Sequence, residues 1–361
     1  MELKYKPDFE RAKKYFEAFW QKEVIDRPLV SITAPGKNGS WPDYHEINCV
    51  NTFRARGDRD ETLRLLEGYE RYVAGITWMG EAIPYVQMDF GPDMFASFFG
   101  AEIQASDSVA TTWSVPSVTD WTAFEGKMDT SEGSYYDYFF KTLRLAAEFS
   151  EGKFLISCPD IHANLDALSA LRGPQNLCFD LMDCPGEVEE ALRRVRAEFK
   201  PLWDNVFNTL HAHERGSLGW IPTYSSGRFA TLQCDAICLI GPQQARRFVI
   251  PALVEECGYM DSVSYHFDGK EALPHLEDIL AIDGIDVIQW VPGDGQPRSI
   301  EWMDLLHRIQ AAGKGLWIYD WTAEEIKSRF KELKPEGLIF SVGVNSIDEG
   351  EELLEHLVKN M

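Results

Sequence analysis

The chain has 361 residues and carries 35 lysines and arginines against 58 aspartates and glutamates, so its formal net charge is −23. This charge would repel nucleic acids and anionic membrane surfaces, which argues against both as main partners. Apolar residues make up 45 % of the chain and include 11 Trp, 13 Tyr and 21 Phe. This is enough material for a large core and excludes a disordered chain.

The cysteines and the N-terminal segment indicate a cellular compartment. The chain has seven cysteines and no Cys-x-x-Cys pair, and an odd number in a long chain argues against a disulfide framework. Residues 1–7 lack the apolar stretch of a signal peptide, and no apolar run is long enough to span a membrane. We therefore expect a soluble cytoplasmic protein, with a profile that suits an enzyme of small molecules.

The first half of the chain contains an early helix pattern and several candidate strands. Apolar residues spaced three and four apart between Phe9 and Trp20 predict a helix within an N-terminal extension, residues 1–28. Short apolar segments predict strands at 29–33, 83–89, 154–158 and 219–224. A long stripe from Val188 to Leu210 predicts one helix after the third of these strands.

Strand and helix patterns alternate regularly through the second half. Strands are expected at 260–265, 285–290, 316–319 and 337–342, with a short additional strand at 236–240. This alternation is typical of parallel strands joined by crossover helices. We predict an α/β fold, with residues 29–361 forming a single (β/α)₈ TIM barrel that carries extra N-terminal helices. An open doubly wound sheet is less favoured, because no glycine-rich phosphate loop follows an early strand.

Polar residues follow the predicted strands, where a barrel places its catalytic groups. We expect Asp89, Asp235 and His266 to be catalytic. The predicted substrate-binding residues are Asp160, His162, Tyr224, Gln289, Trp290 and Asp320. The His266-Phe-Asp268-Gly269 turn is the strongest candidate, because its two polar side chains precede a tight glycine turn and can both face the pocket.

Structural roles are the alternative for several of these residues. A strand-end aspartate often caps the following helix through its carboxylate, and this applies to Asp89, Asp160 and Asp320. The tryptophans are more often barrel packing than part of a cofactor site. The sequence contains no Walker A loop, His-Glu-x-x-His, Gly-x-Ser-x-Gly or paired Cys-x-x-Cys motif, which leaves nucleotide hydrolysis, zinc proteolysis and serine-hydrolase chemistry without support.

Several segments, in order along nearly the whole chain, resemble the uroporphyrinogen decarboxylase superfamily. They are Pro159-Asp-Ile-His-Ala-Asn-Leu-Asp-Ala-Leu-Ser-Ala-Leu-Arg-Gly173, Asp183-Cys-Pro185, Gln233-Cys-Asp235, Gly241-Pro242, Phe248-Val-Ile-Pro251, Tyr265-His-Phe-Asp-Gly269 and Ser341-Val-Gly-Val344. The resemblance implies a TIM barrel. It also implies one of two activities, the decarboxylation of haem synthesis or zinc-dependent methyl transfer with a corrinoid protein.

The decarboxylase motifs are mostly missing. The family's arginine-rich loop corresponds here to residues 31–37, which hold one cation, and its tyrosine falls near Ser169. Its late Gly-His-Gly reads Gly343-Val-Asn345, so Asp89 is the one pocket residue that matches. A pocket without arginines is a poor host for a tetrapyrrole with many carboxylates, which argues against porphyrinogen decarboxylation.

The methyltransferase zinc site is retained in part. Members of that branch bind zinc with a His-x-Cys pair and a later cysteine, which correspond here to His266, Asp268 and Val344. His266 and Asp268 are therefore candidate ligands for a divalent metal such as zinc. Asp160, His162, Asp235 or Asp320 would have to complete the set. Without thiolates, an oxygen or nitrogen compound is a better methyl donor or acceptor than a thiol.

Three functions follow as hypotheses. The first is methyl transfer between a small methylated compound and a corrinoid partner protein, with metal bound or with Asp89 or His266 as general acid or base. The second is a decarboxylase or lyase that acts on a small carboxylic acid or a tetrapyrrole, with Asp89 carrying the proton. The third is a barrel that binds a ligand without catalysis. A homodimer is expected on base rates alone.

Overall fold

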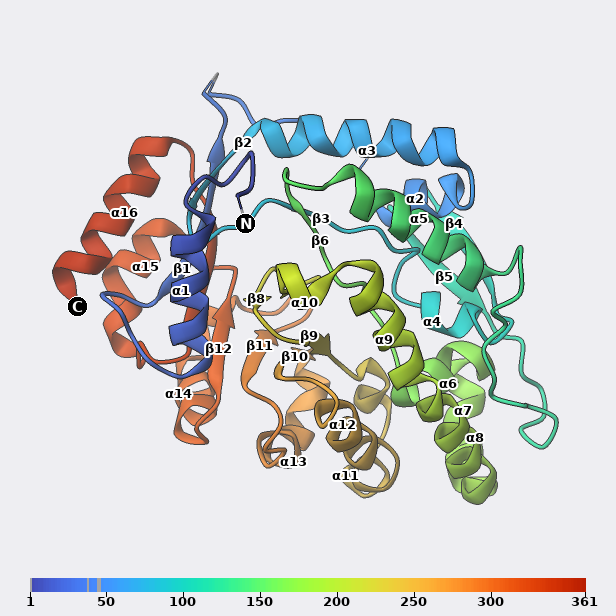
Figure 1. The fold of residues 1–361 in the computed structure, drawn as a ribbon. Coiled ribbons are helices and arrows are strands. Elements are labelled where there is room, and N and C mark those ends of the chain that lie inside the picture. Colours follow the sequence, from blue (N-terminus) through green and yellow to red (C-terminus); the bar gives the residue numbers. More distant parts are fainter. Residues whose placement is uncertain (1, 38, 44–46) are drawn as a thin grey trace.

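The computed structural model describes residues 2–37, 39–43 and 47–361, and its largest sheet within them has seven strands. Their order is β2-β1-β13-β12-β11-β10-β9 (Figure 1). The strands of the chain are β1 (Leu29–Pro35), β2 (Ile76–Gly80), β3 (Tyr85–Val86), β4 (Glu102–Ser106), β5 (Thr111–Val115), β6 (Leu155–Ile156), β7 (Ser217–Leu218), β8 (Tyr224–Ser225), β9 (Phe229–Leu232), β10 (Ser262–Asp268), β11 (Val287–Val291), β12 (Gly315–Ile318) and β13 (Leu338–Gly343).

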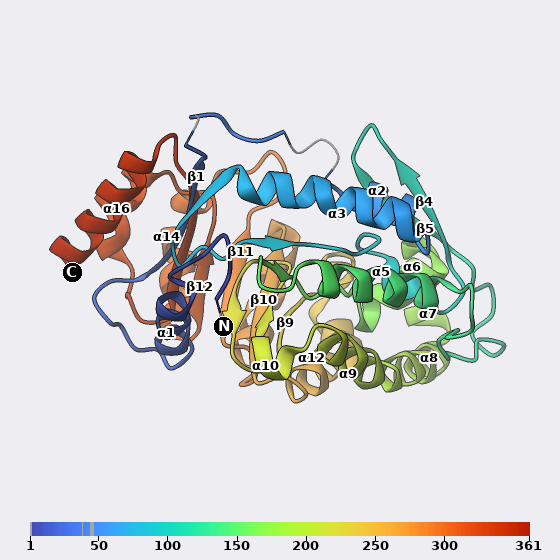
Figure 2. The same ribbon diagram turned by 45° about the horizontal axis from the view of Figure 1, so that its top comes forward.

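Helices connect the strands and surround them. The α-helices are α1 (Phe9–Trp20), α2 (Cys49–Ala55), α3 (Arg59–Ala74), α4 (Met94–Ser97), α5 (Tyr135–Phe149), α6 (Asn164–Arg172), α7 (Pro174–Asp183), α8 (Pro185–Ala197), α9 (Phe199–Thr209), α10 (Ala212–Arg215), α11 (Pro242–Gln244), α12 (Ile250–Cys257), α13 (Leu276–Leu280), α14 (Met303–Ala311), α15 (Ala323–Arg329) and α16 (Ile347–Asn360). The 3₁₀ segments are η1 (Asp235–Leu239), η3 (Lys270–His275), η4 (Ser299–Glu301) and η5 (Phe330–Glu332), and η2 (Ala245–Val249) is a π-helix. Figure 2 shows α16 and the helices α6 to α9 on opposite sides of the strands.

The α/β prediction is confirmed, whereas a closed eight-stranded barrel is not. All neighbours in the seven-stranded sheet are parallel except β2, which is antiparallel to β1. The ladder therefore ends at β2 and β9 within the described residues. The strands β3 and β6 form a separate parallel pair, and the Cys158 amide donates to the Leu218 carbonyl at 2.7 Å, which brings the end of β7 beside the end of β6.

Three local predictions are wrong, and each has a physical reason. Of the strand expected at 219–224, only Tyr224 is in a strand; residues 219–223 are the turn between β7 and β8, where Pro222 has no N–H to donate to a ladder. Residues 236–240 lie in and beside η1, because the Asp166 carboxyl accepts from the first two amides of this turn. The helix expected from Val188 to Leu210 divides at Glu198 into α8 and α9, since Pro201 cannot donate to the Ala197 carbonyl. The strand β9 and the β4–β5 hairpin were not predicted.

Helix α1 covers the amino-terminal end of the strands. Its aromatic residues Phe9, Phe16 and Phe19 form one buried cluster with the first residues of several strands, including Leu29, Leu155 and Val287. This apolar plug closes one end of the strands, so a binding site has to open at their carboxyl end. The division into an extension, residues 1–28, and a barrel, residues 29–361, stays a prediction. None of the helices in the described part of the chain has the length and apolarity that crossing a membrane requires.

Candidate functional site

His266 is held in one orientation at the end of β10. The pairing of β10 with β11 sets His266 beside Gln289, and the His266 Nδ1 lies 2.5 Å from the Gln289 Oε1. An amide oxygen only accepts hydrogen bonds, so Nδ1 is the donor in this contact. The Trp220 ring packs edge-on against the imidazole, with 5.2 Å between ring centroids. Gln289 is therefore a positioning residue for His266.

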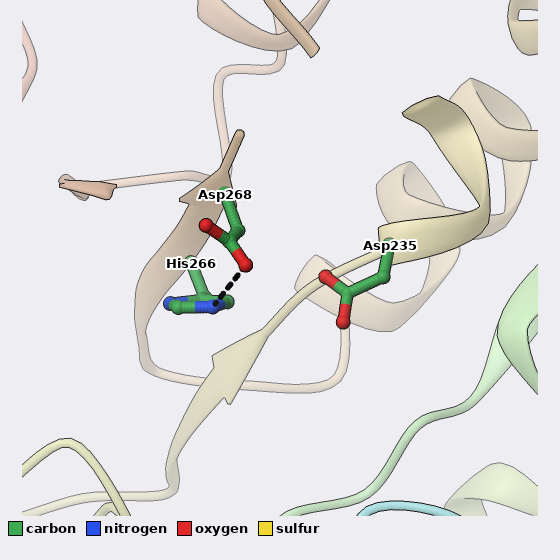
Figure 3. A group of neighbouring side chains, drawn as sticks. All are labelled: Asp235, His266 and Asp268. Atoms are coloured by element: carbon green, nitrogen blue, oxygen red, sulfur yellow. Dashed lines mark ion pairs between the residues drawn. The ribbon is translucent and has the colours of Figure 1, made fainter. Parts of the chain in front are cut away.

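Asp235, His266 and Asp268 form a cluster of potential metal ligands (Figure 3). His266 and Asp268 are two residues apart on β10 and thus on one face of the strand. Asp235 comes from η1. One ligand atom from each residue lies within 4.8 Å of the others, and the His266 Nε2 is 3.9 Å from the Asp268 Oδ2.

The Asp268 carboxyl has an incomplete environment. Its Oδ1 is buried and has no hydrogen-bond partner. Burial raises the pKa of Asp268, the Asp235 charge adds to this increase, and the nearby His266 opposes it. A buried carboxyl oxygen without a donor costs free energy unless a cation or a proton satisfies it.

A second group, Asp160, His162 and Asp166, continues from this cluster. The His162 Nε2 is 3.3 Å from the Asp160 Oδ2, and its Nδ1 is 4.0 Å from the Asp166 Oδ2. Burial by itself lowers the pKa of His162, but the charges of Asp160, Asp166 and Asp235 outweigh it and raise the pKa to about 10. Burial raises the pKa of Asp166 to about 6, against the effect of His162. His162 is thus a cation among carboxylates at neutral pH.

Asp89 is the most enclosed of the predicted catalytic residues. Its carboxyl accepts from the Gln87 Nε2 at 2.6 Å, the Gly91 amide at 3.1 Å and the Asp160 amide at 3.2 Å. Burial, together with the Asp160 charge, raises the pKa of Asp89 despite these hydrogen bonds. Gln233 also reaches Asp160, since its Nε2 donates to the Asp160 Oδ1 at 2.7 Å. Asp89 is therefore connected to the backbone of the His266 cluster through Asp160, His162 and Asp166, whose carboxyl accepts from the Asp235 amide.

A cavity of about 540 Å³ opens beside Asp89 and Asp160. Its wall consists of strand-end residues, loop residues and aromatic rings. They are Ser31, Thr33, Trp41, Ile47, Asn48, Cys49, Tyr69, Tyr72, Ile76, Trp78, Ala82, Ile83, Tyr85, Val86, Gln87, Asp89, Gly91, Pro92, Ala110, Asp160, Pro222 and Ser341. This volume lies within the usual range for small-molecule sites.

Three predicted substrate-binding residues lie elsewhere. Tyr224 packs among the aromatic side chains of α1, and its hydroxyl donates to the Arg215 carbonyl, so it belongs to the closed amino-terminal end. Trp290 alternates with Gln289 along β11 and therefore points the opposite way, into the core. Asp320 accepts from the amide and the hydroxyl of Ser299 at the start of η4, so it holds an earlier turn, whereas Thr322 caps the following helix α15. These positions do not support substrate binding by any of the three.

Four residues of the site were not predicted. Asp166 and Gln233 lie within the family-like segments, and the i,i+4 spacing of Asp166 from His162 could have indicated its role. Asn164 lies in the same family-like segment as Asp166, whereas Glu256 carried no signal in the sequence. The Asn164 Nδ2 donates to the Glu256 Oε2 at 3.2 Å and to the Gln233 carbonyl at 3.0 Å, a contact between side chains 92 residues apart. Only the tertiary fold brings these two side chains together.

The comparisons with known proteins give a fold. Neither the family models nor the curated proteins contain a match to this sequence. Among solved structures, the chain is similar to a methyltransferase from Methanosarcina mazei. The two chains are 12 % identical, the alignment covers 96 % of this chain and 98 % of that one, and the TM-score is 0.61. This likeness shows a shared fold over nearly the whole of both chains.

Proposed function

We propose that this protein is an enzyme that transfers a methyl group between a small methylated compound and a corrinoid partner protein, with a divalent metal bound by Asp235, His266 and Asp268. The ligand cluster at the carboxyl ends of the strands is the observation that carries the proposal. The shared fold with a solved methyltransferase supports it. The arrangement of the strands around this end is also consistent with an irregular TIM barrel as the finer description of the fold.

The residues fit a metal ion in three respects. One imidazole nitrogen and two carboxylates are a common ligand set for zinc and related ions. The other His266 nitrogen donates to Gln289, as the second nitrogen of a metal-bound histidine usually does. The unsatisfied Asp268 Oδ1 lacks a positive partner. Ligand atoms around zinc lie at most about 4 Å apart, so rotation of the exposed Asp235 side chain would close the set.

Methyl transfer requires that the group leaving the methyl carbon be stabilised. The bond between the methyl carbon and the donor atom breaks, the electron pair stays on the donor atom, and the acceptor supplies the pair for the new bond. A bound divalent metal would supply Lewis acidity to an oxygen or nitrogen donor atom. Asp268 and His266 would hold it. The protonated His162, joined to Asp160, can return a proton to an oxygen that leaves as an anion.

Metal content and methyl exchange test this proposal. We expect about one divalent ion per chain, as found in three-ligand catalytic sites, and methyl exchange with a corrinoid protein for at least one O- or N-methyl compound. His266→Ala and Asp268→Ala should lose both the metal and the exchange, whereas His213→Ala, at an exposed histidine of α10, should keep them. Metal content that is equal in all four proteins would contradict the ligand assignment. Ligand binding without turnover would favour the non-catalytic alternative.

A carboxy-lyase that acts on a small acid is the second candidate. Asp89 lies in the cavity wall, and burial raises its pKa, so it can hold a proton for delivery. In such a reaction carbon dioxide leaves, and the carbon that keeps the electron pair takes this proton. The absence of Lys, Arg and His from the described residues of the cavity wall argues against a tetrapyrrole with many carboxylates. Carbon dioxide release that Asp89→Asn abolishes would support this candidate over methyl transfer.

A further inference from the structure

We propose that the cavity beside Asp89 binds a small methylated ammonium compound, such as a quaternary amine, through its aromatic wall and its buried carboxyls. Binding of this compound needs neither the metal nor the corrinoid partner. The additional statement that the bound amine is the methyl donor rests on the function proposed above. In that reaction the methyl carbon–nitrogen bond breaks, the electron pair stays on a neutral tertiary amine that leaves, and the corrinoid supplies the pair for the new bond, so no Lewis acid at the nitrogen is needed.

The charges of the cavity wall favour a cation. Among the described residues of the wall, Asp89 and Asp160 are the acidic side chains, and there is no Lys, Arg or His. His162 offsets the charge of Asp160, since its Nε2 lies 3.3 Å from that carboxyl. Among the residues that the structure describes, no cation is paired with Asp89, and its hydrogen bonds come from neutral groups. A positive ligand is therefore favoured at the Asp89 side, because it stabilises the ionised form of this carboxyl, and an anionic ligand is repelled.

The rings of the wall suit an ammonium group that carries methyl groups. Two tryptophans and three tyrosines line the cavity, namely Trp41, Trp78, Tyr69, Tyr72 and Tyr85. The Trp78 Nε1 donates to the Val73 carbonyl at 3.0 Å, and its ring meets the Tyr85 ring edge-on at 6.4 Å, so this part of the wall is fixed before a ligand arrives. A quaternary ammonium has no N–H to donate, and aromatic faces with a carboxylate are the usual means of binding it.

A buried hydroxyl at the cavity also points to a ligand. Ser31 is 5 % exposed, and its Oγ has no hydrogen-bond partner. Thr33 and Ser341 line the same region, and Ser31 pairs with Ser341 in the β1–β13 ladder. The cavity, at about 540 Å³, exceeds what a bare ammonium head requires. It therefore suits a compound whose ammonium lies near the rings and whose hydroxyl or ether oxygen reaches Ser31.

Calorimetry with matched probes tests the inference. Choline and its uncharged analogue 3,3-dimethylbutan-1-ol have nearly the same shape, and propionate supplies the opposite charge. We expect choline to bind at least about tenfold more tightly than the analogue, and propionate not to bind. Equal binding of choline and the analogue, or a preference for propionate, would overturn the inference.

Variants locate the binding. Trp78→Leu and Asp89→Asn should each reduce the affinity for choline by about tenfold. They should also reduce the ratio of the affinity for choline to the affinity for its uncharged analogue. Trp113→Leu, at an exposed tryptophan of β5 outside the cavity wall, should leave the choline affinity and this ratio unchanged. Trp41→Leu, at a side chain that is 47 % exposed, repeats the test if a buried variant does not fold. Choline binding that none of the three cavity variants weakens would place the site elsewhere and refute the inference.

The two proposals fail separately. Calorimetry is performed on the protein alone, so selective choline binding without methyl exchange would contradict the methyltransferase function and leave the binding inference standing. Methyl exchange from an uncharged donor, together with equal binding of choline and its analogue, would support the methyltransferase function and refute the binding inference.

Discussion

The buried carboxyl of Glu256 makes stability depend on pH in a way that one substitution should remove. Glu256 lies on α12 and is 2 % exposed. Its Oε2 accepts from the Asn164 Nδ2 at 3.2 Å, and its Oε1 has no partner. Burial raises the pKa of Glu256 from 4.5 to about 8, and the Asn164 hydrogen bond and the Arg196 charge oppose this only in part. The folded protein therefore keeps Glu256 protonated at neutral pH.

The sign of the effect follows from proton linkage. Above about pH 4.5 the unfolded chain releases the Glu256 proton, while the folded chain keeps it until about pH 8. The folded state binds more protons across this window. The contribution of Glu256 to stability is therefore fully present below about pH 4.5 and decreases as the pH rises towards about 8. The slope is about 1.4 kcal/mol per pH unit, and the total is on the order of 5 kcal/mol.

Glu256→Gln imitates the protonated acid and should remove this slope. Urea unfolding between about pH 5 and about pH 8 gives the free energy of unfolding of both proteins. The free energy of unfolding of the variant, relative to that of the unmodified protein, should rise by several kcal/mol from about pH 5 to about pH 8. The contributions of other buried acids are the same in both proteins and cancel in this difference. Glu351→Gln, at an exposed glutamate of α16, should show no such gain. A difference that stays constant from pH 5 to pH 8 would refute a buried, protonated Glu256.

Two further substitutions probe the site and the core. Gln289→Leu removes the acceptor of the His266 Nδ1, so metal affinity should fall by about 10- to 100-fold while the fold is kept, and equilibrium dialysis with zinc measures this. Glu81→Gln breaks a buried two-point ion pair with Arg27, whose two N···O distances are both 2.7 Å. Unfolding in urea should show a loss of about 3–5 kcal/mol, because a buried guanidinium loses its charge partner. A loss below about 1 kcal/mol, typical of surface pairs, would contradict this.

The local sequence determined the parts of the fold that repeat. Apolar runs bounded by helical stripes located β10 to β13 within three residues, because a strand buried on both faces needs a continuous apolar run. The same reading failed at 219–224 and at 236–240. In those segments one proline and one distant carboxyl, that of Asp166, decide the backbone conformation.

The residues of the candidate site were likewise predicted only in part from the sequence. The sequence by itself placed Asp89, Asp160, His162, Asp235, His266 and Asp268 after strands, and parallel strands bring such residues to one end. It could not separate Gln289, which orients His266, from Trp290, which packs in the core, because pairing register decides which neighbour faces inward.

Only the tertiary structure decided which charged groups lie next to one another and which buried polar atoms lack a hydrogen-bond partner. The contact of Asn164 with Glu256, the enclosure of Asp89 and the aromatic cavity wall all join segments that are far apart in sequence. Burial and the charges of spatial neighbours shift a pKa, and neither quantity is contained in local sequence. The chemistry of this end of the molecule is therefore set by packing, while the residue types available to it are set by the sequence.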